Sequence, residues 1–471
     1  MERPATSSEG SLFELVARGQ KDKYFMSDSE KAVTPFSYEL NTWPASLNEV
    51  KETQPLNMVD FGRSIEWELD AFGDVLLAAS FSITLPSWLP PSVVGLNYKS
   101  VVQDASGTRY GYTRGIAAFL FEQIQFYQDN VLLQEFSGDF LYAWAHMQGS
   151  LSFESLLLKE LGDHTGTPIE IQRNAVPGKL NLRLPLIGCA HGEEGGFPFV
   201  AVPGQKYRLR CKLRKLEDLV ESSAGHVKPT PWSRKDLTIS DGTGNQTSIA
   251  PLARELIDRP LIVLKTIQRY VRPQTQNLVR QTSTSIPFLR PFENVLSIDP
   301  ADYVGVGGGT SSYITKRIDG RHPSEGLLIF FQSDYCLERN QLWNLLNPLN
   351  AGNYYTSMKL LIAGKEREAT WSPLVWQDLS PFTKLELTPQ IPVSWISFTY
   401  GPSYGYKGPE LRSPSGTVNM SAADRPTLWL DIIDTLPSSV TMKKRVAMRC
   451  ITIGWGIYSI DTSRGYIKFQ N

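Results

Sequence analysis

The sequence is poor in the features that mark secreted, membrane-spanning and disulfide-bonded proteins. Its 471 residues include only four cysteines, which lie far apart and form no C-x-x-C pair: Cys189, Cys211, Cys336 and Cys450. In a chain of this length such a pattern is typical of reduced thiols in a cytosol-like compartment. No apolar segment of signal-peptide length follows Met1, and apolar runs such as Leu327–Phe331 are far too short to cross a bilayer. We therefore expect a chain that is made and kept in cytosol unless a larger assembly carries it out. We also expect the N-glycosylation acceptors at Asn245 and Asn419 to stay unused.

An excess of charge of either sign is also missing. The chain has 47 Lys and Arg against 48 Asp and Glu, which gives a formal net charge of −1. A dedicated nucleic-acid binder normally carries a clear basic excess, so we expect no specific nucleic-acid partner. One basic row does occur, in which Lys206, Arg208, Arg210, Lys212 and Arg214 alternate with apolar residues. We interpret this row as the solvated face of a strand or as a subunit contact.

Signals of catalytic and metal chemistry are weak. None of the five histidines lies in a G-x-S-x-G or H-E-x-x-H motif. The glycine-rich segment 305–310 lacks the Lys-Ser/Thr pair that completes a phosphate-binding loop. Cys189, His191, Glu193 and Glu194 lie together, but their spacing matches no standard zinc site. We therefore expect no catalytic residue, no cofactor and no metal ion, and a protein that is not an enzyme.

What the sequence does contain is the composition of a β-sandwich. Aromatic residues reach 11%, and 31 prolines and 36 glycines are spread along the chain. Turn formers at short intervals between aromatic and β-branched stretches are typical of all-β proteins. Alternation of apolar and polar residues over 64–70 and 80–85 predicts a hairpin of half-buried strands. The remaining patterns predict one helix within 140–162, strands at 207–213, 327–331, 396–400 and 428–432, and a strand pair within 446–460.

Length and composition also predict the domain organisation. A chain of 471 residues exceeds what one hydrophobic core usually organises, so we expect two domains of similar length. Residues 217–250 carry Pro, Gly and charge without periodicity, which indicates a connector. The predicted order is therefore an N-terminal arm at 1–25, a first domain at 26–216, this connector, and a second domain at 251–471.

In residues 10–24 a Leu-rich arm leads to Gly19, Gln20, Asp22 and Tyr24. This segment and several later ones, in the right order, resemble the major capsid proteins of nucleocytoplasmic large DNA viruses, whose opening has a Leu-rich arm before an Ala/Gly-Gln-Asp-x-Tyr segment. Residues 61–85 are similar to the family's first hairpin, and 139–144 to its aromatic segment that ends in Trp. The end of the chain, 463–467, resembles its Gly-rich C-terminus.

The second half carries the more specific motifs of this resemblance. His322 and Pro323 open a segment that is similar to the family's His-Pro-x-x-Glu-Leu-x-Trp strand. Its Pro-x-Gly-x-x-Asn-x-Ser segment is matched by Pro414, Gly416, Asn419 and Ser421. The connector at 217–250 matches none of the family's segments.

The resemblance implies an all-β double jelly roll, that is, two eight-stranded antiparallel β-sandwiches in one chain, with short helical excursions in loops. It implies a structural virion protein, a major capsid protein whose homotrimers are pseudo-hexagonal and tile the icosahedral shell of a large DNA virus. The implied partners are copies of the chain, neighbouring capsomers and minor capsid proteins. The implied location is the capsid shell, reached after assembly in the host cytoplasm.

Two alternatives stay open at this point: a minor or vertex-associated jelly-roll capsid paralogue, and a carbohydrate-binding β-sandwich protein. The arm adds a separate hypothesis. Its cluster of Leu12, Phe13, Leu15 and Val16 predicts an inward-facing segment that contacts an internal viral membrane or minor proteins. The competing interpretation of this segment is a frayed terminus.

Overall fold

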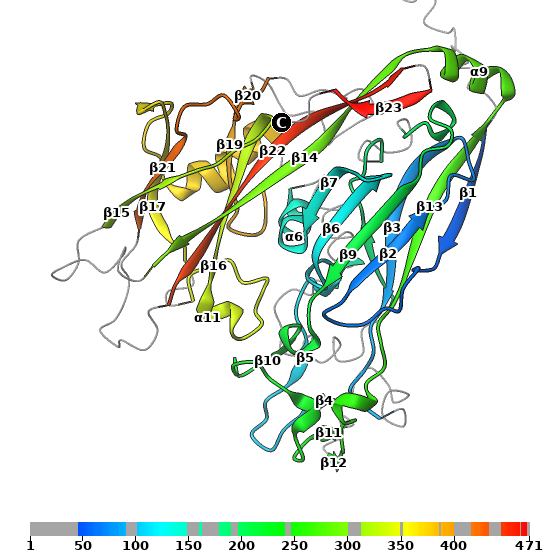
Figure 1. Cartoon of the computed structure of the whole chain (residues 1–471). Helices are drawn as coiled ribbons and strands as arrows, with labels where there is room; N and C mark the ends of the chain where they lie inside the picture. Colours follow the sequence, from blue (N-terminus) through cyan, green and yellow to red (C-terminus); the bar gives the residue numbers. More distant parts are fainter. Residues whose placement is uncertain are drawn as a thin grey trace, which may run out of the picture. The chain divides into compact units, whose positions relative to one another are not determined.

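The computed structural model describes twelve stretches of the chain (Figure 1), which are 46–90, 101–147, 160–162, 179–189, 196–240, 246–299, 312–348, 352–385, 388–399, 416–432, 444–461 and 463–468. The predicted arm, with Leu12, Phe13, Leu15 and Val16, lies outside them. None of the helices within these stretches has the length and apolar character needed to span a membrane.

The first sandwich consists, within the described residues, of two antiparallel sheets of four strands each. One sheet has the order β1 (Ser46–Thr53), β13 (Leu261–Val271), β3 (Val75–Thr84) and β8 (Leu180–Arg183). The other has the order β2 (Ser64–Leu69), β9 (Tyr207–Leu213), β6 (Phe121–Gln128) and β7 (Val131–Ser137).

The second half repeats this construction. One sheet has the order β14 (Thr284–Ile298), β22 (Val446–Asp461), β16 (Pro323–Ser333) and β19 (Ser394–Ser397). The other has the order β15 (Ser312–Arg317), β21 (Thr427–Ile432), β17 (Tyr355–Ile362) and β18 (Lys365–Glu366). Two short strands extend the first of these sheets, since β20 (Val418–Asn419) pairs with β16 and β23 (Arg464–Ile467) pairs with β22.

Both halves share one connectivity. If the eight sandwich strands of each half are counted in chain order, one sheet reads 1-8-3-6 and the other reads 2-7-4-5 in both halves. This order, in which consecutive strands mostly fall in opposite sheets, is that of a jelly roll. The predicted fold class, a double jelly roll, is confirmed.

Helical segments are short and lie in the connections. The α-helices are α5 (Ile116–Phe119), α6 (Gly138–His146), α9 (Pro273–Gln281), α11 (Asp334–Leu337) and α12 (Ser380–Leu385), and α12 follows a π-helical turn, η5 (Val375–Leu379). Single 3-10 turns are η1 (Phe199–Ala201), η2 (Leu216–Asp218), η3 (Pro231–Ser233) and η4 (Arg254–Leu256). The helix predicted within 140–162 coincides at its start with α6, and most of its remainder lies outside the described residues.

Local sequence explains which face of each strand is buried. In β9 the apolar Tyr207, Leu209, Cys211 and Leu213 are buried, and the basic residues between them are exposed. This is the period of two expected of a strand with one face in a core. The predicted strand pair within 446–460 is instead the single long strand β22, because nothing in its sequence forces a turn.

The predicted hairpin of 64–70 and 80–85 is wrong in its pairing. Both segments are strands, but β2 pairs with β9, whereas β3 pairs with β13 and β8. The rings of Trp67 and Phe81 lie 4.8 Å apart between their centroids, so the two strands meet face to face across the core. Alternation reveals the buried face of a strand but not its neighbour in the sheet.

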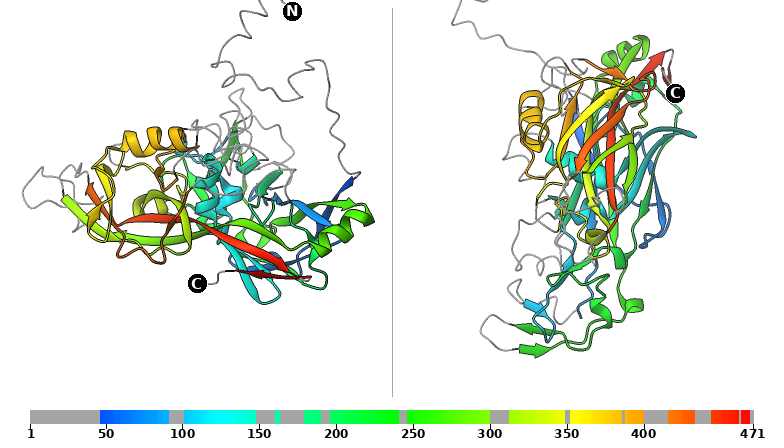
Figure 2. Two further views of the ribbon diagram at one scale, coloured as in Figure 1. Left: turned by 90° about the horizontal axis from the view of Figure 1, so that it is seen from above. Right: turned by 90° about the vertical axis from the view of Figure 1, so that its left-hand side faces the viewer.

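Strand pairing also moves the boundary between the two domains. Within 217–250, β10 (Val220–Ser222) pairs with β5 (Tyr110–Tyr112), and β11 (Thr238–Ser240) pairs with β12 (Gln246–Ser248) and β4 (Val101–Gln103). Downstream of the predicted boundary at residue 251, β13 still belongs to the first sandwich. The chain therefore crosses to the second sandwich at α9. Composition does not distinguish a linker from an insertion between two strands, so the connector predicted at 217–250 is instead an insertion of the first sandwich. Figures 1 and 2 place the sheet of β4, β11 and β12 beyond one end of the first sandwich.

Candidate assembly site: the junction between the two sandwiches

One sheet of the second sandwich is buried on both faces. Leu328 and Phe330 of β16 belong to the apolar cluster that also fills the first sandwich. Their neighbours Leu327 and Ile329 belong to a separate cluster inside the second sandwich. Strands β7 and β14, one from each half, lie side by side at this boundary (Figure 1). The sheet of β14, β22 and β16 therefore closes the second sandwich with one face and packs against the first with the other, which is why 327–331 is a continuous apolar run.

A buried group of charges joins the two sandwiches at this junction. Asp139, in the first turn of α6, is 3% exposed. Its Oδ2 atom lies 2.6 Å from Nη2 of Arg214 in the first half and 3.2 Å from Nη2 of Arg449 in the second. Gln332 of β16 donates a hydrogen bond from Nε2 to the other carboxylate oxygen at 3.0 Å. Arg449 also pairs with Glu293 of β14, so residues of both sandwiches hold one carboxylate.

These charges keep one another ionised. Burial alone would raise the pKa of Asp139, but Arg449, Arg214 and the Gln332 amide outweigh it and lower that pKa to about 2. Burial acts against the charge of Arg449 as well, yet Asp139 and Glu293 raise the pKa of this guanidinium. A buried pair of this kind is costly to break, because removal of one partner leaves the other charge without compensation.

Uncharged contacts cross the junction at three further places. They are hydrogen bonds from Gln134 Nε2 to Leu289 O at 2.7 Å, from Asn340 Nδ2 to Val220 O at 2.6 Å, and from Gln128 Nε2 to Gly465 O at 2.9 Å. Each of the three amides is buried. Contacts at several separate places prevent rotation of one sandwich against the other unless buried polar groups lose their partners. The junction therefore fixes the angle between the two sandwiches.

The structure brings together most of the motif residues that sequence analysis singled out in the second half. Pro323 and Asn419 are paired residues of β16 and β20. The backbone N–H of His322 donates to Ser421 Oγ at 3.0 Å. His322 has a φ of 65°, a left-handed conformation that is uncommon for a residue other than glycine. Gly416 is half-buried just before β20, and Pro414 lies outside the described residues. The two motifs thus fasten one end of β16, next to the junction.

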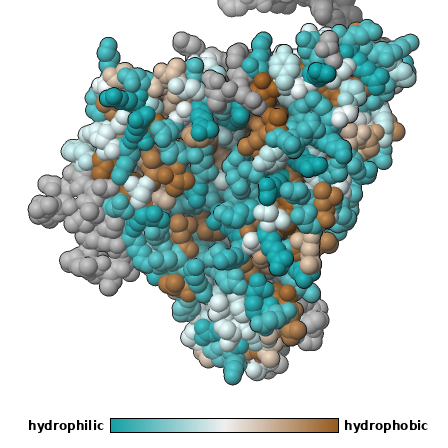
Figure 3. Space-filling model, viewed as in Figure 1, coloured by the Kyte–Doolittle hydropathy of each residue, from teal (hydrophilic) through white to brown (hydrophobic). Residues whose placement is uncertain are grey.

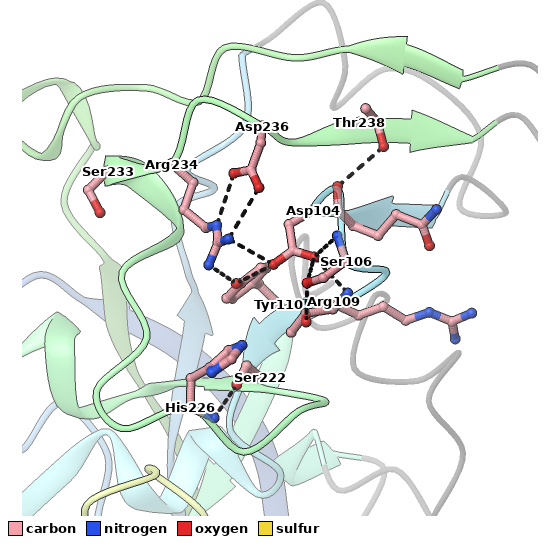
Figure 4. A network of polar contacts seen from close by, with 12 residues as sticks. Asp104, Ser106, Arg109, Tyr110, Ser222, His226, Ser233, Arg234, Asp236 and Thr238 are labelled. Atoms are coloured by element: carbon pink, nitrogen blue, oxygen red, sulfur yellow. Dashed lines mark hydrogen bonds and ion pairs between the residues drawn. The ribbon is translucent and has the colours of Figure 1, made fainter.

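A second polar network lies in the insertions of the first sandwich (Figure 4). Oδ1 of Asp104 accepts hydrogen bonds from the backbone and the hydroxyl of Ser106, at 2.9 and 2.6 Å. Oδ2 accepts from the Tyr110 hydroxyl at 3.0 Å and pairs with Arg234 Nη2 at 3.0 Å. Burial opposes the charge of Asp104, but these contacts lower its pKa to about 2. The network ties the insertion after β3 to the insertion after β9.

The basic row of β9 lies among acidic neighbours on the surface. The ion pairs are Lys206 with Glu68 at 3.9 Å, Arg210 with Glu66 at 3.5 Å, and Lys212 with Glu122 at 2.8 Å. On the face that Figure 3 shows, hydrophilic side chains dominate and apolar ones form small separate groups. This mixture of charges fits the interpretation of the row as a solvated strand face for Lys206, Arg208, Arg210 and Lys212. The interpretation is wrong for Arg214, whose side chain lies in the junction beside Asp139.

The other segments considered as chemical sites are only partly described. Cys189 is half-buried with a free thiol, whereas His191, Glu193, Glu194 and the glycine-rich segment 305–310 lie outside the described residues. In the stretches that the structure describes, no three His, Cys, Asp or Glu side chains gather into a group able to hold a metal ion.

Comparisons with known proteins match the fold but not the sequence. No protein-family model and no curated protein matches this chain. PBCV-1 VP54, in a crystal structure fitted into a cryo-EM reconstruction of the virophage Sputnik, is similar with a TM-score of 0.66 at 13% identity, over 93% of this chain and 100% of that chain. The chain of a quasi-atomic model of the PBCV-1 virus capsid has a TM-score of 0.66 at 14% identity, with the same coverage. The Faustovirus major capsid protein has a TM-score of 0.61 at 13% identity, over 96% of both chains. At such identities the likeness establishes a shared fold.

Proposed function

We propose that this chain is a structural virion protein, the major capsid protein of a large DNA virus, and that it acts by assembly rather than by catalysis. Three copies would form a pseudo-hexagonal capsomer, and such capsomers would tile an icosahedral shell. The proposal rests chiefly on the junction: two jelly rolls of identical connectivity are joined by buried charges and a shared apolar cluster. The fold likeness to the Faustovirus major capsid protein, over nearly the full length of both chains, supports it.

The shape requirement explains why the junction matters for this function. Three chains give a six-cornered outline only if each chain contributes two similar bodies at a constant angle. A hinge between the sandwiches would let the outline vary and would spoil contacts between neighbouring capsomers. The buried Asp139 group and the apolar face of β16 supply the required rigidity.

A cyclic trimer also needs two different, complementary surfaces on each chain. Exposed apolar side chains occur on both sandwiches, and those that gather on one element are candidates for contact with a partner. On the first sandwich Leu47 and Val50 are exposed on opposite faces of β1; on the second, Leu374, Leu379 and Phe382 are exposed around η5 and α12. We assign β1 and the segment of η5 and α12 to the contact between neighbouring copies.

Light scattering of the purified chain tests the proposal. A stable particle of three chain masses that does not dissociate on dilution is the expected result. A chain that stays monomeric at all concentrations, and that does not appear in shells when expressed with its viral partners, would overturn it.

The alternatives have separate readouts. A minor or vertex-associated paralogue would be scarce in purified particles, whereas the principal shell protein should dominate them by mass. A carbohydrate-binding protein would retain glycans from an array. Deletion of residues 1–20 tests the arm, since normal trimers and normal particles without it would contradict its predicted inward contacts.

A further inference from the structure

A cleft of about 830 Å³ opens at the junction of the two sandwiches. Its walls combine strands β6, β7 and β9 of the first sandwich with β14, β22 and the two residues before β16 of the second. The Phe292 ring gives it apolar wall surface, with Phe136 and Phe140 buried behind the wall, and several charged side chains face it. Clefts of this size with a few placed polar groups are the usual form of a binding site.

Three basic residues meet at one end of this cleft. Arg290 lies on β14, and Arg321 and His322 precede β16. A Cβ atom added to Gly454 of β22 would lie 2.8 Å from the Arg290 carbonyl oxygen, 3.2 Å from His322 Cβ and 3.4 Å from the Arg321 carbonyl oxygen. The Arg321 guanidinium stacks over the Phe292 ring, 4.7 Å from its centroid. The backbones of Arg290 on β14 and of Arg321 and His322 just before β16 therefore meet around one glycine of β22.

Two of these basic groups have no counter-charge. Three other cations of the cleft are neutralised, since Arg449 and Arg214 share Asp139 and Lys212 pairs with Glu122. Among the described residues, neither Arg290 nor Arg321 forms an ion pair or a side-chain hydrogen bond, and Nη1 of Arg290 is buried without a partner.

Burial and the neighbouring arginines lower the pKa values of these basic groups. Burial and the nearby Arg321 lower the pKa of Arg290. Burial, Arg290 and Arg321 lower the pKa of His322 to about 4, so this imidazole is neutral at pH 7. Buried charges in proteins are normally paired, and a guanidinium held without an anion is unfavourable unless a ligand supplies one.

We propose that Arg290 and Arg321 form a binding site for a carboxylate carried by another polypeptide of the shell, an acidic side chain that enters the cleft from a partner protein. The inference rests on the proposed function and adds a contact to it. Guanidinium groups bind carboxylates through two parallel hydrogen bonds, which suits two arginines at one site. The Phe292 ring on the wall of the cleft favours a side chain of a polypeptide over a fully hydrated inorganic ion.

Binding of a capped hexapeptide that contains Asp and Glu, measured on the full-length chain at constant ionic strength, tests this site. The comparison probes are its Asn/Gln counterpart and inorganic phosphate. We expect the acidic peptide to bind at least about ten-fold more tightly than the amide peptide, the change expected when a charge-assisted pair is lost. The variant R290Q/R321Q should lose that preference. R317Q, which alters an arginine exposed at 68% on β15, should keep it.

The outcomes separate the site from its alternatives. Equal affinity for phosphate and for the acidic peptide would show a site for any free oxyanion and would overturn the partner contact. A preference for the acidic peptide that survives in R290Q/R321Q would overturn the assigned residues. If R290Q/R321Q does not fold, R290K/R321K, which keeps both charges but loses the forked geometry, should weaken the acidic peptide several-fold. Light scattering on the same samples distinguishes the two proposals. A monomer that still binds the acidic peptide would contradict the proposed trimeric capsomer and would support the proposed carboxylate site.

Discussion

The third strands of the two sandwiches, β3 and β16, occupy the same place in the same connectivity but differ in what covers them. In β3, buried residues alternate with partly exposed ones, and Ser80 and Ser82 lie on the less buried face. In β16, ten consecutive residues after Pro323 are buried. The sheet that contains β3 has one face in a core, whereas the sheet that contains β16 has the first sandwich against its second face. The same topology therefore occurs in two environments. The side chains on the outer face of a sheet determine whether another sandwich can pack against that face.

The sharpest way to break this comparison is to place a charge on the outer face of each strand. Leu328→Asp puts a carboxylate at a position with no exposed surface in the junction, so we expect a loss of more than about 4 kcal/mol in the free energy of unfolding, or no folded protein. Ser80→Asp in β3 lies opposite Lys265 and Arg183, so we expect a change within about 0.5 kcal/mol. Urea unfolding measures both, and equal losses would contradict the difference drawn between the two sheets.

The next prediction concerns the charges of the junction. Asp139→Asn leaves Arg214 and Arg449 buried without their shared carboxylate, and we expect a cost of about 3 to 5 kcal/mol. The control is Asp70→Asn, which removes an ion pair with Lys51 whose side chains are 53% and 41% exposed. We expect that change to cost less than about 1 kcal/mol. A small effect of Asp139→Asn would mean that the two sandwiches are held by apolar contact alone.

The same carboxylate predicts a pH dependence. The folded-state pKa of Asp139 is about 2, which is below the value of about 3.9 for an unfolded chain. Its contribution to stability is therefore fully present above about pH 4 and is lost as the pH falls toward 2. Urea titrations from pH 5 to pH 2 should show a steeper loss for the wild type than for Asp139→Asn, which has no carboxylate to protonate at this position.

The insertions that follow β3 and β9 contain β4, β5, β10, β11 and β12. They allow a prediction about a region outside both sandwiches. Asp104→Asn removes a charge that organises Ser106, Tyr110 and Arg234, and we expect a local cost of about 1 to 3 kcal/mol. Because the β4, β11 and β12 sheet lies beyond one end of the first sandwich, proteolysis within 220–240 should accelerate while the junction keeps its unfolding midpoint. Asp319→Asn, at a side chain that is 73% exposed, is the control. A global loss of stability in Asp104→Asn would show that the insertion is coupled to the sandwiches.

The comparison of β3 with β16 also shows which features of the structure could be predicted from the sequence. The alternation in β9 and the continuous run at 327–331 correctly distinguish a strand with one buried face from a strand with two. The two motifs at His322 and Asn419 are visible in the sequence, and the structure adds that they pair. Such features are local, because each depends on side chains within a few residues of one another.

Features that depend on partners far along the chain could not be predicted in the same way. The carboxylate of Asp139 meets Arg214 75 residues away and Gln332 193 residues away. Asp139 begins the segment 139–144, whose aromatic residues carry part of the resemblance, and no residue near it in the sequence indicates an ion pair. The hairpin assigned to 64–85 was wrong for the same reason, since the neighbours of β2 and β3 are supplied by β9 and β13. The role of Arg290 could not be predicted from the sequence either, because its lack of a partner becomes apparent only when β14, β16 and β22 are assembled.

The smallest effect on folding, with the largest consequence for assembly, is expected at Phe382. This side chain of α12 is 60% exposed, so Phe382→Asp should change the free energy of unfolding of the isolated chain by less than about 0.5 kcal/mol. In the proposed capsomer the same residue meets a neighbouring copy, and a buried aspartate there has no partner. Light scattering should therefore show monomers for Phe382→Asp and trimers for Val227→Asp, a control at an apolar residue that is 55% exposed in the insertions. A trimer that persists in Phe382→Asp would remove α12 from the contact and would leave β1 and its exposed Leu47 as the surface to examine, because any closed trimer must use two different patches of each chain.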